Sequence, residues 1–347
     1  MRPLPPPPKP VPGDRVAILS PSRGLPEFFP LPFEAGLRRL RERFGLVPVE
    51  YPATRVYGAS PADRAADLHA AFADPRIKAV ICSIGGEDLI TVLPLLDTDL
   101  LRANPKPFFG YSDATCLLTL LHTLGLAAYH GGAVMCQFGR AGAMHPASAE
   151  SLRAALFGSG PFELVPGKEF GDVDVPWDDA DALTREPPMA PSEGWTWLRA
   201  DRVVDGACWG GCLEILSWLA MADKNIGDPE RFAGGVLFLE TSEELPSAAE
   251  VYRILRNLGE RGLLGAFDAA LIGRAKAWAL DRRLEPAESA AYRADQRAAV
   301  ERAFAEYNPA ATLVFDLEIG HTEPQVVLPY GGRVRVDGPG RRITVWY

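Results

Sequence analysis

The first half of the chain alternates short apolar runs with stretches in which apolar residues recur every three or four positions. Runs such as Val16–Ser20 and Lys78–Ser83 predict buried strands, and the spacing over residues 33–44 predicts a helix between them. A further helix start is predicted at Ser60-Pro61, where a hydroxyl cap is followed by proline at the first helical position. Repeated alternation of strand and helix predicts a Rossmann-like α/β domain, in which helices cover a parallel sheet on both faces.

The pattern changes between about residues 162 and 199, which are rich in acids, prolines and tryptophan and have no period of either kind. Strands and helices resume in the second half, and the last 35 or so residues are predicted to be rich in strands. We therefore expect an α/β domain over residues 13–165, a connecting segment over 166–200, and a smaller strand-rich domain over 201–347. The first dozen residues hold seven prolines and predict an extended, poorly ordered arm.

Composition narrows the class of protein. The 347 residues are 47% hydrophobic and 23% charged, which is typical of a globular chain of about two domains. A net charge of −9 disfavours nucleic acid or an anionic membrane as a partner. No apolar run approaches the roughly 20 residues of a membrane span, and the N-terminus lacks a secretory pattern. Five cysteines in apolar contexts predict reduced thiols and a cytoplasmic protein, and Cys208 and Cys212 lack the second ligand pair of a zinc site.

Two loops after predicted strands could hold reactive groups. In the loop Ser83–Asp88, Gly85-Gly86 can turn sharply and leave amide hydrogens free for an anion, although such a pair also occurs in ordinary tight turns. The second loop places Ser112 between a strand and a helix, which is the context of a nucleophile elbow. The competing interpretation is that Ser112 or Asp113 only caps the helix.

A nucleophilic serine needs a base, and the base needs an acid that orients it. Glu240 ends an apolar strand, and His321 lies in a loop better suited to a base than the positions of the other four histidines. Alternatively, Glu240 is a surface acid and His321 an ordinary loop histidine. Spacing alone does not bring His321 to Ser112.

Five motifs in order give a resemblance to a known family: Ser83-Ile-Gly-Gly-Glu87, Gly110-Tyr-Ser-Asp-Ala-Thr115, Gly210-Gly-Cys-Leu213, Leu237-Phe-Leu-Glu-Thr241 and Gly320-His-Thr-Glu-Pro324. Together they resemble the LD-carboxypeptidase family of serine peptidases, over nearly the whole chain from about residue 13. The segments Glu240-Thr-Ser-Glu-Glu244 and Glu193-Gly-Trp-Thr-Trp197 look more like the branch that contains the microcin C immunity protein than like the muropeptide-trimming enzymes.

The resemblance implies a role for individual residues. It implies a catalytic triad of Ser112 as nucleophile, His321 as general base and Glu240 as orienting acid, with an oxyanion hole formed by the backbone amides of Gly86 and Asp113. It also implies a two-domain fold with the triad at the junction, a homodimer, and no metal or cofactor. In the immunity branch an aromatic residue of the connecting segment can stack on a base, and Trp177 falls in that region. Trp177 could equally pack at the domain junction.

Three functions follow from these observations. The first is a cytoplasmic, metal-independent serine hydrolase that cleaves the amide bond of peptidyl- or aminoacyl-nucleotide compounds. The second is a muropeptide L,D-carboxypeptidase that releases a terminal D-residue from a cell-wall tetrapeptide. The third is a catalytically silent α/β module that holds a small anion on the Gly85-Gly86 loop.

Overall fold

The computed structural model describes all residues from 1 to 347, and its first half is built on a six-stranded sheet. The strand order is β14-β5-β4-β3-β1-β2, in which only β14 runs antiparallel. The bounds are β1 Arg15–Leu19, β2 Val47–Glu50, β3 Ile77–Cys82, β4 Phe108–Gly110, β5 Ala128–His130 and β14 Leu328–Tyr330. Five neighbouring parallel strands confirm the predicted Rossmann-like α/β architecture.

Helices accompany these strands along the first half of the chain. They are α1 Pro30–Phe44, α2 Pro61–Ala73, α3 Thr98–Ala103, α4 Thr115–Thr123 and α5 Pro146–Phe157. Helix α2 begins as predicted, because Ser60 Oγ accepts a hydrogen bond from the Asp63 N–H at 3.1 Å and Pro61 takes the first helical position.

The second half is built on an eight-stranded sheet with the order β6-β16-β15-β10-β11-β12-β13-β9. Its four central strands are parallel, and antiparallel strands extend it on both sides. The bounds are β6 Pro161–Leu164, β9 Thr196–Leu198, β10 Val203–Cys212, β11 Gly235–Glu240, β12 Phe267–Gly273, β13 Thr312–Leu317, β15 Arg333–Asp337 and β16 Arg342–Trp346. The helices of this half are α6 Leu213–Met221, α7 Ala248–Glu260, α8 Leu263–Ala266 and α9 Pro286–Tyr307. The second sheet confirms the predicted strand-rich second part.

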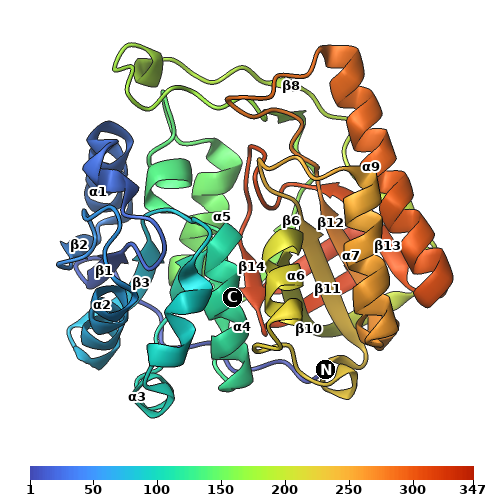
Figure 1. The fold of residues 1–347 in the computed structure, drawn as a ribbon, viewed down its shortest axis with the longest axis horizontal. Helices are drawn as coiled ribbons and strands as arrows, with labels where there is room; N and C mark the ends of the chain where they lie inside the picture. The colour runs from blue at the N-terminus through green and yellow to red at the C-terminus, as the bar shows by residue number, and fades with distance from the viewer.

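The two sheets share one hydrophobic core, since a single cluster of buried side chains includes residues from both. Strand β14 comes from the second half of the chain but pairs with β5 of the first sheet. The buried Tyr330 hydroxyl of this strand donates to the Gly210 carbonyl of β10 at 3.0 Å. The halves, which lie side by side in Figure 1, are therefore packed against each other through buried side chains and backbone.

The segment between the halves crosses the upper edge of the molecule in Figure 1. It includes the short antiparallel pair β7 Glu169–Phe170 and β8 Ala190–Pro191, and it ends with β9, which pairs with β13. Gly171 and Glu323 exchange two backbone hydrogen bonds of 2.9 and 2.7 Å, which tie the segment to the loop that carries His321.

Candidate active site

The loops that carry the predicted site residues meet where the two sheets adjoin. Ser112 follows β4, the Gly85-Gly86 turn follows β3, Glu240 ends β11, and His321 follows β13. All four strands are parallel members of their sheets, so these loops leave from carboxyl ends, where α/β proteins place their binding sites.

Ser112 lies in a strained turn. Its φ is +58°, a left-handed conformation that a residue with a side chain adopts rarely, and helix α4 begins three residues later. The turn is possible because Gly110 has no side chain: a Cβ there would lie 2.7 Å from the Ala114 Cβ and 2.9 Å from the Cys82 Sγ. This is the strand–turn–helix geometry of a nucleophile elbow.

The Gly85-Gly86 turn lies directly against the serine. A Cβ on Gly85 would lie 3.1 Å from the Ser112 Oγ and 3.6 Å from the Asp113 backbone nitrogen, so only a glycine lets the two loops approach this closely. The structure therefore brings together the predicted nucleophile and the loop that carries Gly86.

The Asp113 side chain has a role that the sequence interpretation missed. It is fully buried, and it accepts hydrogen bonds from the Ser22 hydroxyl and from the Leu89 N–H, the latter at 2.9 Å. Burial raises the pKa of this carboxyl against the opposing effect of those hydrogen bonds. Through these hydrogen bonds, Asp113 links the loops that follow β1 and β3 to the turn that carries Ser112.

Glu240 and His321 form a buried pair. Their side chains are 1% and 8% exposed, and His321 Nδ1 lies 2.6 Å from Glu240 Oε2. Burial alone would raise the pKa of Glu240 and lower that of His321, but their mutual attraction outweighs it, so the pKa of Glu240 falls and that of His321 rises. Gly320 allows the contact, because its φ is +86° and a Cβ there would lie 2.4 Å from Glu240 Oε2.

The other ring nitrogen of His321 faces a second carboxylate. His321 Nε2 lies 3.3 Å from Glu243 Oε2, whose side chain is 57% exposed. The His321 ring also packs edge-to-face on Tyr111, the residue before the serine, with centroids 5.1 Å apart. The structure thus brings His321 to the elbow, but no hydrogen bond joins Ser112 to His321, and Nε2 is directed to Glu243 instead.

A cavity of about 100 Å³ opens beside His321 and is walled by the connecting segment. Trp177 lines it and packs edge-to-face on Phe29 at 5.8 Å. Two cations also line the cavity and both are paired: Lys276 Nζ lies 2.8 Å from Asp174 Oδ1, and Arg140 Nε lies 2.6 Å from Glu323 Oε2.

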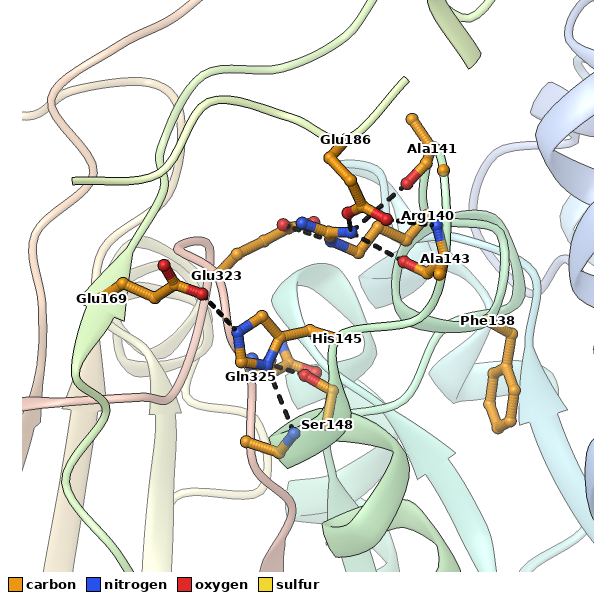
Figure 2. A network of polar contacts seen from close by, with 12 residues as sticks. Phe138, Arg140, Ala141, Ala143, His145, Ser148, Glu169, Glu186, Glu323 and Gln325 are labelled. Carbon is orange, nitrogen blue, oxygen red and sulfur yellow. Dashed lines mark hydrogen bonds and ion pairs between the residues drawn. The ribbon is translucent and has the colours of Figure 1, made fainter. Parts of the chain in front are cut away.

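Figure 2 shows how Arg140 joins three parts of the chain. Its guanidinium lies between Glu323, two residues after His321, and Glu186 of the connecting segment, and it also donates to the Ala143 carbonyl at 2.7 Å. This network could not be predicted from the sequence, because its members are far apart along the chain.

Each helix of the structure is either too short or too polar to span a lipid bilayer. No group of three or more His, Cys, Asp or Glu side chains lies close enough together to hold a metal ion.

A strained serine after a parallel strand, beside a glycine turn and a buried Glu–His pair, is an arrangement suited to a serine hydrolase. Comparison with known families agrees: the LD-carboxypeptidase N-terminal domain matches residues 16–131, and the C-terminal domain of the same family matches residues 205–336. The chain belongs to the LD-carboxypeptidase family of serine peptidases, and it is an enzyme of that class.

Relatives within the family carry different names. A putative carboxypeptidase of Streptomyces coelicolor is 30% identical over 99% of this chain and 97% of its own length. The murein tetrapeptide carboxypeptidase of Pseudomonas aeruginosa is 30% identical over 79% of this chain and 77% of its own. The microcin C7 self-immunity protein of Escherichia coli is 24% identical over 82% of this chain and 78% of its own length.

A solved structure resembles the whole fold. A protein of Streptococcus pneumoniae that is like the microcin immunity protein, crystallised with AMP, superposes with a TM-score of 0.84 at 25% identity, covering 96% of this chain and 99% of that one.

Proposed function

We propose that this enzyme hydrolyses amide bonds through Ser112, His321 and Glu240. The observation that carries the proposal is the junction itself: a strained serine lies against the Gly85 turn while a buried Glu240–His321 pair is presented from the other sheet. A silent anion-binding module would need the glycine turn but not the buried pair, so we do not favour that alternative.

Each group has a distinct task in the proposed reaction. His321 Nε2 takes the proton of the Ser112 hydroxyl as Oγ attacks the amide carbonyl, and Glu240 holds the Nδ1–H and stabilises the imidazolium. The backbone N–H groups of Gly86 and Asp113 stabilise the oxyanion. His321 then protonates the leaving amine, and water hydrolyses the acyl-enzyme by the reverse path. Because Nε2 faces Glu243 in this structure, the Glu243 side chain must turn away before the serine can bond to Nε2.

For the substrate we favour an amide that joins a carboxyl-side amino acid to a nucleotide-like group. Trp177, which is supported by Phe29, gives the cavity beside His321 an aromatic wall on which a base could stack. The solved relative with AMP and the microcin immunity relative support this choice. The murein tetrapeptide carboxypeptidase relative supports the alternative, removal of a D-residue from a muropeptide.

Two measurements test this proposal. Ser112→Ala should remain folded and lose about four to six orders of magnitude in hydrolysis, as expected for a triad nucleophile. The ratio of kcat/KM for an aminoacyl sulfamoyl adenosine and a muropeptide tetrapeptide, measured on one preparation, should favour the nucleotide. Activity of Ser112→Ala within about tenfold of the parent would refute the triad. A ratio that favours the muropeptide would refute only the substrate.

A further inference from the structure

A second histidine faces the oxygen of the Glu240 carboxylate that His321 does not contact. His130 ends strand β5 and is paired in register with Gly110, so it lies one strand from the Ser112 elbow. Its side chain is 0% exposed, and its Nε2 lies 3.7 Å from Glu240 Oε1. The ring is held edge-to-face by Phe238 at 4.7 Å and by Tyr111 at 6.2 Å.

The atoms that face each other here have no other partners. Glu240 Oε1 and both ring nitrogens of His130 are buried without a hydrogen bond, whereas Glu240 Oε2 is bonded to His321. Unpaired polar atoms of this kind are costly in a protein interior, and three of them at one spot require an explanation. A small movement of either side chain would pair two of the three, since only 3.7 Å separates Nε2 from Oε1.

We propose that His130 is a positioning residue for the triad, whose Nε2–H donates to Glu240 Oε1 when the substrate-bound site tightens. Hydrogen bonds of catalytic groups are often long in unliganded enzymes and shorten in the complex. With both oxygens engaged, the carboxylate cannot rotate, and Oε2 stays on His321 Nδ1. This inference rests on the proposed roles of Glu240 and His321.

The arrangement has a consequence for the pH dependence of the serine. When His321 is neutral, no positive charge compensates the Glu240 carboxylate, so a hydrogen-bond donor at Oε1 stabilises it most in that state. Loss of this donor therefore destabilises the deprotonated state of the Glu240–His321 pair, and the pair binds its proton more tightly. The other titratable groups nearby are the Tyr111 phenol, which adjoins both rings, the Cys212 thiol, which is affected by the charge of Glu240, and three acids that interact with His321, namely Glu214, Glu243 and Glu244. All of these groups are unchanged when His130 alone is replaced.

The test uses the rate at which a fluorophosphonate probe labels Ser112, followed by mass spectrometry between about pH 5 and 10. His130→Phe keeps an aromatic ring against Phe238 but removes the donor, whereas His130→Gln restores an N–H near the Nε2 position. We expect His130→Phe to slow labelling about 10- to 100-fold. Losses of this size are typical when a residue that hydrogen-bonds to a metal ligand, and so orients it, is replaced. The midpoint of the pH profile should rise, and His130→Gln should return both quantities toward the parent values.

A folded His130→Phe variant with unchanged rate and midpoint would overturn the inference, and so would a rate loss without a shift in midpoint. If His130→Phe does not fold, nitrogen NMR of ¹⁵N-histidine-labelled parent protein decides. We expect a protonated Nε2 on His130 whose signal moves in Glu240→Gln, and a bare Nε2 would overturn the inference. Failure of the proposed function is distinguishable, because Glu240→Gln and His321→Ala would then label as fast as the parent.

Discussion

His321 lies between two carboxylates, each of which contacts one of its ring nitrogens. Glu240 is buried and contacts Nδ1 of His321. Glu243 is half-exposed and contacts Nε2, the nitrogen that accepts the Ser112 proton in the proposed mechanism. Both charges favour imidazolium and raise the pKa of His321 above the ordinary value of 6.5, against the opposing effect of burial. Since a base must be neutral, kcat/KM should fall as the pH drops through that raised pKa.

Glu243→Gln separates the contributions of the two acids. It removes one charge from Nε2, so we expect the midpoint of the acid limb of kcat/KM to move to lower pH and activity near pH 6 to increase. The neighbouring acid Glu244 makes no ion pair with the ring and serves as the matched control, for which Glu244→Gln should move the midpoint less. A midpoint that stays fixed or rises in Glu243→Gln would contradict this account of His321.

The strands and helices with a clear period could be predicted from the sequence, and those set by distant partners could not. Helix α2 and strand β11 follow from a capping signal and a long apolar run. Strand β5 is only three residues long, and β10 contains three glycines, so neither carries a usable period. Strand β14 belongs to the first sheet only because of its pairing with β5, a contact between residues about 200 positions apart.

The same limit applies to the site. Ser112, Glu240 and His321 lie in local motifs, each at a strand end, and so they could be selected from the sequence. His130 also ends a strand, but its proposed positioning role depends on a contact with Glu240, which belongs to the other sheet. This contact could not be predicted from the sequence. Glu243 lies in no pattern that distinguishes it from other acids of the chain, and only the loop geometry shows that this half-exposed side chain contacts His321.

The connecting segment carries a prediction about substrate choice. Residues 171–177 are held down by the Gly171–Glu323 backbone bonds and by ion pairs from Asp172 to Arg293 and from Asp174 to Lys276. Trp177 is therefore presented at a fixed place in the cavity wall. Base stacking on one aromatic side chain contributes about 1–3 kcal/mol in nucleic-acid binders, which corresponds to roughly one or two decades in affinity.

Trp177→Ala should lower kcat/KM for an aminoacyl sulfamoyl adenosine by about 10- to 100-fold and leave a muropeptide substrate unchanged. Trp177→Phe, which keeps a ring, should retain most of the activity on the nucleotide. An equal loss on both substrates would assign the tryptophan to packing against Phe29 instead of to recognition.

The N-terminal arm ties the two halves of the molecule together. It is extended, as its prolines predict, but it is not free of the body: the Leu4 N–H donates to the Gly331 carbonyl at 2.8 Å, and the Lys9 ammonium donates to the Tyr129 hydroxyl at 2.6 Å. Tyr129 belongs to the first sheet, and Gly331 lies between β14 of the first sheet and β15 of the second. The second sheet is contacted directly, because the Ala207 N–H of β10 donates to the Met1 carbonyl at 3.3 Å. The arm therefore adds to the shared core as a link between the sheets, on the side of the fold away from the strand ends that carry the site.

Lys9 makes this link sensitive to pH. Its ammonium also lies over the Tyr129 ring, 4.1 Å from the centroid, and no carboxylate pairs with it. Burial lowers the pKa of Lys9 from 10.5 to about 7. Between these two values the unfolded chain keeps a proton that the folded chain has released, so the unfolded state binds more protons and stability rises with pH across this window.

Lys9→Met keeps the apolar stem and removes the titration. We expect the Tm of the parent minus the Tm of Lys9→Met to increase as the pH is raised from about 7 to 10. At a fixed pH, kcat should be the same in both proteins, because the arm does not contact the site. Taking the difference between the two proteins cancels the other titrating groups, and scanning calorimetry at several pH values measures it. A Tm difference that stays constant, or that shrinks with rising pH, would show that Lys9 keeps its proton in the folded chain and that the arm is held by its backbone and prolines alone.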